Sequence, residues 1–266
     1  HRVLRLLPDN VRIIGCTATP SRADGTAMGR GGAGFEALVA PRGSEYSTLV
    51  ANGWLAPCRV IRPRNAPTPA RAYLEHGDGR PGILFAPTVA ACQAAIDALA
   101  RDGGVRGAVI SAHTSDAVRA RAFAAFGTAG GPLVLASPMA LSEGFDSPRA
   151  KVCILDRSCV HVGTYLQCAG RVLRPYQGQT ALLIDLRGAS ERHGSPLADR
   201  SYSLEGEPIR PAAAPERRRD APRGRAGARQ RAAANRTAPT MAAMWVDTAR
   251  AAGAALASVW RVFMSA

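Results

Sequence analysis

Four residues near the end of an apolar segment have the types and spacing needed to bind phosphate. Gln167, Gly170, Arg171 and Arg174 recur at intervals of three and four, so they share one face if the helix expected over residues 161–173 includes them. Arginine keeps its charge and binds phosphate oxygens two at a time. In nucleotide hydrolysis, such an arginine stabilises the charge that develops on the transferred phosphoryl group. The alternative is a solvated basic helix face.

Two carboxylates lie in the segment LSEGFDSP, residues 141–148, directly after an apolar stretch. Glu143 and Asp146 flank Gly144, and a carboxylate at a sheet edge can accept a hydrogen bond from a ribose hydroxyl. The alternative is that the aspartate only caps or stabilises a turn. A further short segment, Thr17-Ala18-Thr19-Pro20, also follows an apolar stretch, and alone it is typical of an ordinary turn at a strand end.

The elements that would position these residues follow an α/β pattern. Short apolar segments predict strands at residues 10–16, 58–63, 82–87, 107–112, 132–137, 151–156 and 180–186. Helical spacing and capping residues predict helices at residues 45–55, 89–103, 115–127 and 161–173, with Thr88 and Ser115 as N-caps. Residues 63–81 are rich in proline and glycine and are expected to connect elements. The alternation predicts a parallel, doubly wound sheet, in which the loops at the carboxyl ends of the strands form the site.

Composition favours a polyanionic partner and argues against several other classes. The net charge is +14, which favours nucleic acid, although arginine-rich composition is an alternative source of the charge because Lys151 is the only lysine. Six cysteines occur without a C-x-x-C pair, so we expect no metal site and small buried thiols in a reducing cytoplasm. No apolar segment is long enough to span a membrane.

Taken in order, the segments resemble a known family. They read IIGCTATPSRADG (13–25), NGWLAP (52–57), LSEGFDSP (141–148), YLQCAGRVLRP (165–175) and DLRGASERHG (185–194). Their order and spacing resemble motifs III to VI of superfamily 2 helicases of the DEAD/DEAH type, and most closely the RadD-like and phage-type group. The resemblance covers about residues 1–208. It implies RecA-like domains and an ATP-dependent motor that acts on nucleic acid, DNA more than RNA.

The resemblance also implies roles for individual residues. Arg171 and Arg174 would be arginine fingers, with Gln167 in the same motif. The nucleotide would also contact Glu143, Gly144, Asp146 and Gly170. Thr17, Ala18 and Thr19 would couple nucleotide state to nucleic-acid binding, and Phe85, His113 and Ser137 would lie along the nucleic acid.

The resemblance further implies a division of the chain into segments. Residues 1–20 would end a first RecA-like domain, 21–62 would be a linker, and 63–209 would form the second RecA-like domain. Residues 210–238, rich in arginine and alanine, are expected to be a disordered tail, and 239–266 a helix. The phosphate-binding G-x-x-x-x-G-K-[ST] segment and the Mg²⁺-binding Asp-Glu pair do not occur, so ATP and Mg²⁺ would depend on a missing N-terminal part and the chain alone would be inactive. Two alternatives stay open: a non-catalytic nucleic-acid-binding remnant, and a translocase subunit of a restriction-type nuclease.

Overall fold

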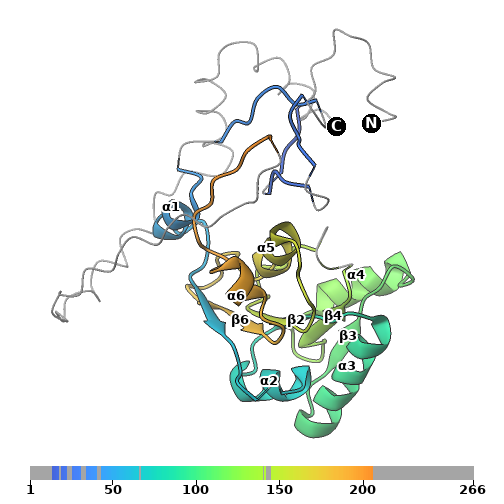
Figure 1. The fold of residues 1–266 in the computed structure, drawn as a ribbon. Coiled ribbons are helices and arrows are strands. Elements are labelled where there is room, and N and C mark those ends of the chain that lie inside the picture. Colours follow the sequence, from blue (N-terminus) through green and yellow to red (C-terminus); the bar gives the residue numbers. More distant parts are fainter. Residues whose placement is uncertain are drawn as a thin grey trace, which may run out of the picture.

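The computed structural model contains one parallel sheet that crosses the domain (Figure 1). It describes residues 14–17, 19–22, 26–30, 34–40, 43–65, 67–139, 141 and 145–205. Ala18, Glu143, Gly144 and the tail from residue 206 onward, with its expected helix, lie outside the described residues. In the described part the strand order is β1-β6-β5-β2-β4-β3, and every neighbouring pair is parallel.

The strands in the described part of the chain are short, and four of them are buried on both faces. Their bounds are β1 Cys58–Ile61, β2 Gly82–Phe85, β3 Gly107–Val109, β4 Val134–Ser137, β5 Val152–Leu155 and β6 Ala181–Asp185. Every residue of β2, β4, β5 and β6 is buried, as expected for parallel strands covered by helices on both sides. The predicted α/β class and parallel sheet are confirmed.

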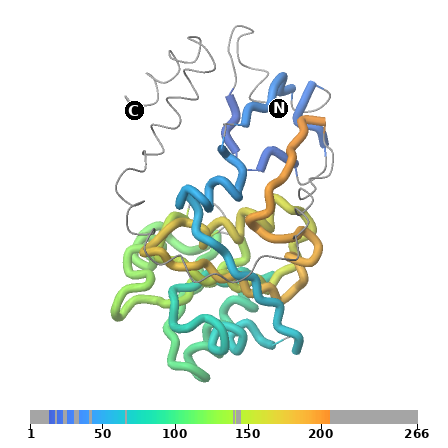
Figure 2. Tube along the Cα trace, turned by 90° about the vertical axis from the view of Figure 1, so that its left-hand side faces the viewer, coloured from blue at the N-terminus to red at the C-terminus, as the bar shows by residue number. Residues whose placement is uncertain are grey.

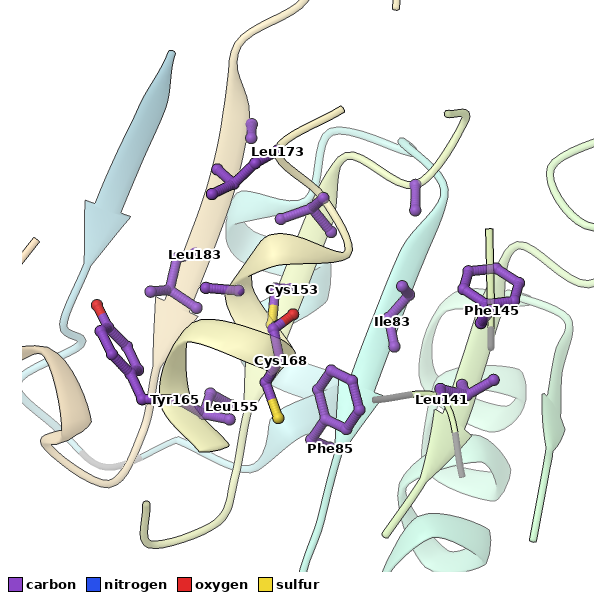
Figure 3. Close-up of a cluster of buried hydrophobic side chains, with 14 of the residues drawn as sticks. Ile83, Phe85, Leu141, Phe145, Cys153, Leu155, Tyr165, Cys168, Leu173 and Leu183 are labelled. Carbon is purple, nitrogen blue, oxygen red and sulfur yellow. The ribbon is translucent and has the colours of Figure 1, made fainter. Parts of the chain in front are cut away.

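Helices cover both faces of the sheet and create two apolar clusters. Their bounds are α1 Tyr46–Ala51, α2 Pro69–His76, α3 Val89–Gly103, α4 Asp116–Ala125, α5 Val162–Gly170 and α6 Ala189–His193. Along β2, Ile83 and Phe85 point to the cluster under α5, whereas Leu84 points to the cluster under α2 and α3. Figure 3 shows Phe85 and Ile83 within the first cluster, beside Cys168 of α5. This alternation is the two-residue period of a strand.

Several predicted boundaries hold and others do not. Thr88 caps α3 by accepting from the Ala91 backbone N–H at 3.1 Å, and Gly104 ends the helix in the left-handed conformation. Helix α2 occupies the stretch predicted as a connector, because Thr68 caps it and Pro69 is tolerated in a first turn. Ile14, Gly15 and Cys16, predicted as the end of a buried strand, are exposed and lie outside any strand.

Strand β1 lies within the stretch predicted as a linker, yet it belongs to the sheet. Its four residues pair with Ala181–Ile184 of β6. The edge strand thus continues the sheet that holds the site. No helix in the described part of the chain is long and apolar enough to cross a membrane.

Two segments distant in sequence lie side by side beyond the sheet. The backbone N–H groups of Met28 and Gly29 both donate to the Leu204 carbonyl at 2.8 Å. Asp199 accepts from the Ser47 N–H at 2.9 Å and from the Ser47 hydroxyl at 2.6 Å. Figure 2 shows the blue N-terminal segment beside the orange stretch that ends near residue 205. The stretch after α6 therefore fixes the segment that precedes β1.

Candidate functional site

The helix that carries the candidate arginines ends earlier than its pattern predicts. Helix α5 stops at Gly170, and Arg171 is its C-cap. The backbone N–H groups of Arg171, Val172 and Leu173 each donate to the carbonyl three residues earlier, at 3.3, 3.1 and 3.3 Å. This spacing winds the chain more tightly than an α-helix. The chain tightens because Val172 and Leu173 enter the core and Pro175 disfavours a helical Arg174. The prediction that Arg174 shares one helix face with Gln167 is therefore wrong.

Both arginines nevertheless reach the same loop, the one that follows β4. The Arg171 Nη1 donates to the Phe145 carbonyl at 3.0 Å. The Arg174 Nε lies 3.0 Å from Asp146 Oδ1, and 35% of the Arg174 side chain and 72% of the Asp146 side chain are exposed. Two segments that the sequence identified separately thus form one cationic site at the edge of the sheet.

Phe145 anchors this loop in the core. Its ring meets Phe123 at 4.7 Å and Phe126 at 5.7 Å between centroids, both edge-on, and 1% of Phe145 is exposed. The neighbouring Asp146 is exposed, and it lies between the buried residues Phe145 and Ser147. Burial of Phe145 therefore fixes the carbonyl that Arg171 contacts and the carboxylate that Arg174 contacts.

A buried lysine that the sequence prediction missed lies behind Arg174. Lys151 has no exposed surface, and its Nζ donates to the main-chain carbonyl of Arg174. The ring centroid of Tyr176 lies 6.0 Å from the same nitrogen. Burial lowers the pKa of the Lys151 ammonium. The signal available in the sequence was the single lysine of the chain, placed at the start of an apolar strand.

The segment that contains Thr17 and Thr19 packs on the first turn of α5. A side chain added at Gly163 would place its Cβ 3.8 Å from Thr19 Oγ1 and 3.9 Å from Ser21 Oγ. Thr19 is buried, its N–H donates to Thr17 Oγ1 at 3.1 Å, and its carbonyl accepts from the Ser21 N–H at 2.7 Å. The segment therefore contacts the helix whose other end carries Arg171.

The remaining predicted residues separate into buried and accessible positions. Phe85 and Ser137 are the last residues of β2 and β4, and neither has exposed surface. Their side chains therefore do not reach a ligand. Any contact with nucleic acid would be made by the loops that follow these strands. His113 is exposed in the turn after β3, where its N–H donates to Ser111 Oγ at 3.2 Å. Gly170 faces open space, because an added Cβ would meet no atom within 4 Å. Gln167 is half-buried on α5.

Two further arginines, missed at the sequence level, join the loops at the carboxyl edge of the sheet. Arg157 Nη1, after β5, donates to the Pro138 carbonyl, after β4, at 2.6 Å. Arg187 Nε, after β6, lies 2.7 Å from Asp156 Oδ1. These bonds hold the loops after three strands in a fixed relation.

The donor set suits an anion better than a metal ion. Within the described ranges, no group of three or more His, Cys, Asp or Glu is arranged to hold a metal. Guanidinium groups such as those of Arg171 and Arg174 have the chemistry to bind phosphate oxygens, and a carboxylate such as Asp146 can accept from a hydroxyl. Mg²⁺ would need oxygen ligands beyond Asp146.

Comparison with known protein families identifies a domain within this chain. Residues 68–176 match the model of the helicase conserved C-terminal domain. This chain contains a helicase C-terminal domain. The matched range begins at Thr68, the N-cap of α2, and runs to Tyr176, just past Arg174. The resemblance to a helicase C-terminal domain indicated by the motifs is confirmed for residues 68–176.

Individual relatives are distant or cover part of the chain. A 51.5 kDa protein of Lactococcus phage isolate 7-9 is 31% identical over 124 residues, which are 47% of this chain and 27% of that protein. This chain thus spans about a quarter of that relative's length.

Solved structures with a related arrangement come from larger proteins. A fragment of a type I restriction enzyme HsdR subunit from Vibrio vulnificus YJ016 gives a TM-score of 0.48 at 17% identity, covering 62% of this chain and 37% of that one. The C-terminal part of the Fun30 ATPase domain gives a TM-score of 0.36 at 13% identity, covering 41% of this chain and 35% of that one. The type ISP restriction-modification enzyme LlaBIII, bound to DNA, gives a TM-score of 0.38 at 14% identity, covering 53% of this chain and 12% of that one.

Proposed function

We propose that this chain is the C-terminal motor half of an ATP-dependent superfamily 2 helicase or translocase that acts on DNA or RNA. The observation that carries the proposal is the convergence of Arg171 and Arg174 on the Phe145–Asp146 loop. A second RecA-like domain would supply the phosphate-binding loop and the Mg²⁺ ligands. This chain would supply the arginine fingers.

The chemistry assigned to the two arginines is electrostatic. ATP, when bound, supplies a phosphoryl group whose oxygens gain charge as the terminal phosphate bond breaks. Arg174 is held toward the loop by Asp146, and its partial exposure leaves it accessible to a phosphate. A guanidinium that already points in the right direction stabilises the developing charge without being reordered during the reaction. The second carboxylate oxygen of Asp146 could accept a hydrogen bond from a nucleotide hydroxyl while the first holds Arg174.

Coupling to nucleic acid would run through α5. Thr19 and Ser21 pack against Gly163 at one end of this helix, and Arg171 caps the other end. A shift of α5 on phosphate contact would therefore move the Thr17–Ser21 segment. Nucleic acid would lie over the loops at the carboxyl edge of the sheet, where His113 is exposed, and the net charge of +14 favours backbone contacts with weak sequence preference.

The direct test measures the binding of inorganic triphosphate to this chain by titration calorimetry. Arg174→Ala should weaken binding by at least about tenfold, because a charge-assisted hydrogen bond is lost. Arg71→Ala is the matched control, since Arg71 forms a 2.7 Å ion pair with Glu75 on the exposed surface of α2 and should leave affinity unchanged. Equal losses in the two variants, or no binding by the native chain, would reject the site.

A second measurement separates the motor from a non-catalytic nucleic-acid-binding module. Fluorescence anisotropy with single-stranded oligonucleotides of different sequence should give similar affinities that fall steeply with salt. The pure chain should show no ATP hydrolysis, because the phosphate loop is absent from its sequence. Tight nucleic-acid binding without any response to triphosphate would favour the binding module over the motor.

A further inference from the structure

Lys151 is held rigidly at the start of β5. Its backbone N–H donates to the Pro81 carbonyl at 2.8 Å, next to β2, and its own carbonyl accepts from the Leu182 N–H of β6 at 2.8 Å. The two neighbouring strands thus fix the lysine backbone from both sides. No part of the residue is exposed, so its side chain has a single protein environment.

The terminal nitrogen of this lysine binds the backbone of Arg174. Its hydrogen bond goes to the Arg174 carbonyl, and the Tyr176 ring lies beside it. Burying a lysine is costly unless its polar atoms are satisfied. Desolvation lowers the pKa of the ammonium, which agrees with a carbonyl and a ring as its surroundings.

Arg174 needs such an anchor because it lies beyond regular structure. It follows the end of α5 at Gly170, and Pro175 after it has no N–H to donate. On its N-terminal side, the Leu173 carbonyl is fixed by the Ala56 N–H at 2.7 Å. On its C-terminal side, the Arg174 carbonyl is fixed by Lys151. The arginine backbone is thereby held at successive carbonyls, and its side chain extends from this base to Asp146.

The chemistry of lysine fits this position better than that of arginine. All the other permanently cationic side chains of the chain are arginines, which makes the single lysine distinctive. An ammonium or amine on a narrow stem can reach one buried carbonyl, whereas a guanidinium would bring five N–H donors into the same space. Replacement by arginine should therefore fail to restore the arrangement.

We infer that Lys151 is a positioning residue that holds the backbone of Arg174 so that its guanidinium points to the phosphate-binding site. This inference rests on the proposed function for the role of Arg174, but the contact itself can be tested without nucleotide. Lys151 does not reach the phosphate in this assignment. It acts through the peptide carbonyl of the arginine.

The single lysine permits a direct spectroscopic test. Lysine labelled with ¹⁵N at Nζ gives one side-chain signal in the whole chain, so it needs no assignment. In the native chain that signal should exchange slowly with water, because the nitrogen is buried and donates to the Arg174 carbonyl. Asp146→Asn removes the side-chain partner of Arg174 but not this backbone bond, so the slow exchange should persist. Glu75→Gln, which breaks the exposed Arg71 ion pair on α2, should leave it in place. Fast exchange of the lysine signal in the native chain would overturn the inference, because it would mean that no bond to the Arg174 carbonyl holds this nitrogen.

Variants at the lysine provide the second arm. Lys151→Met keeps the length of the side chain without a donor, and the Arg174 Nε–H signal should move and exchange faster with water. If Lys151→Met does not fold, Lys151→Gln is measured instead. Glutamine retains an N–H donor for the Arg174 carbonyl, so the Arg174 Nε–H signal should stay near its native position. Arg174 signals that are native in Lys151→Met, or lost in a folded Lys151→Gln, contradict positioning through this bond.

Triphosphate binding distinguishes the inference from the proposed function. Lys151→Met should lose most of the affinity that Arg174→Ala loses, and Lys151→Arg should not restore it. If the native chain binds no triphosphate while the lysine signal exchanges slowly with water, the proposed function fails and the positioning contact stands. If triphosphate binds normally to a folded Lys151→Met, the inference fails and the proposed function stands.

Discussion

The Arg174 Nε and the Asp146 Oδ1 lie 3.0 Å apart and join two loops that come from opposite sides of β5 in the sequence. One loop follows β4 and the other follows α5. Because both side chains are partly or largely exposed, the ion pair adds little to stability and mainly sets the direction of the guanidinium. The pair therefore matters for what the arginine can reach.

Removal of the Asp146 carboxylate should release the Arg174 guanidinium but change the stability of the domain only slightly. Asp146→Asn is expected to lower the free energy of unfolding by about 0.2–1 kcal/mol, the usual value of an exposed ion pair. Thermal unfolding would then shift by roughly 2–4 °C per kcal/mol for a domain of this size. Circular dichroism melts measure the shift, with Glu75→Gln as the control at another exposed pair. A loss of several kcal/mol would mean that the carboxylate has a structural role.

The Phe145 ring should be far more important for stability. Phe145→Ala removes a ring that is 1% exposed and contacts Phe123 and Phe126, so we expect a loss of about 3–5 kcal/mol. Urea unfolding gives the value. Val160→Ala is the control, because Val160 is 60% exposed and should change stability by less than about 0.5 kcal/mol. Similar losses in the two variants would contradict the anchoring of this loop by Phe145.

The sequence predicted the sheet well because its strands are buried on both faces. β2, β4, β5 and β6 are continuous apolar segments bounded by polar or flexible residues, which is the strongest pattern a parallel strand can leave. Helix α2 escaped prediction because its proline-rich surroundings suggested a connector, and its cap at Thr68 is a single side chain. Local pattern was not enough there.

The site was predicted in part, and the reasons differ from residue to residue. Arg171, Arg174 and Asp146 come together although the expected common helix face does not exist, since the contact arises from the fold and not from helical spacing. The contact of Lys151 with a carbonyl is invisible in a sequence, because main-chain partners leave no side-chain pattern. The burial of Phe85 and Ser137 follows from their places in the innermost strands of the sheet.

The packing of Thr19 on α5 predicts a graded response to side chains at Gly163. Gly163→Ala should fold normally and gain up to about 1 kcal/mol of helix stability, because its Cβ would lie at ordinary contact distances of 3.8 and 3.9 Å. Gly163→Leu should displace Thr19 and Ser21. Hydrogen exchange measured by mass spectrometry should then rise in residues 14–22 for the leucine variant alone. Equal exchange in both variants would show that this contact does not hold the segment.

The Asp199–Ser47 contact predicts a pH dependence of known sign. Hydrogen bonds from the Ser47 hydroxyl and N–H lower the pKa of the Asp199 carboxyl below its ordinary 3.8, because they favour the ionised form. The unfolded chain therefore binds a proton before the folded chain does as pH falls. The stability from this contact is fully present above pH 3.8 and is lost as pH falls through the lowered folded pKa.

Ser47→Ala should therefore destabilise the chain by a constant amount near neutral pH and by progressively less below pH 3.8. Thr88→Ala is the matched control, since it removes a hydroxyl that caps α3 and has no carboxylate partner among its hydrogen bonds in the described structure. Its destabilisation should not change over the same range. Unfolding melts from pH 7 down to pH 3 measure both differences. A Ser47→Ala difference that stays constant at low pH would mean that the ionised carboxylate of Asp199 does not hold α1 against the stretch after α6 through the Ser47 hydroxyl.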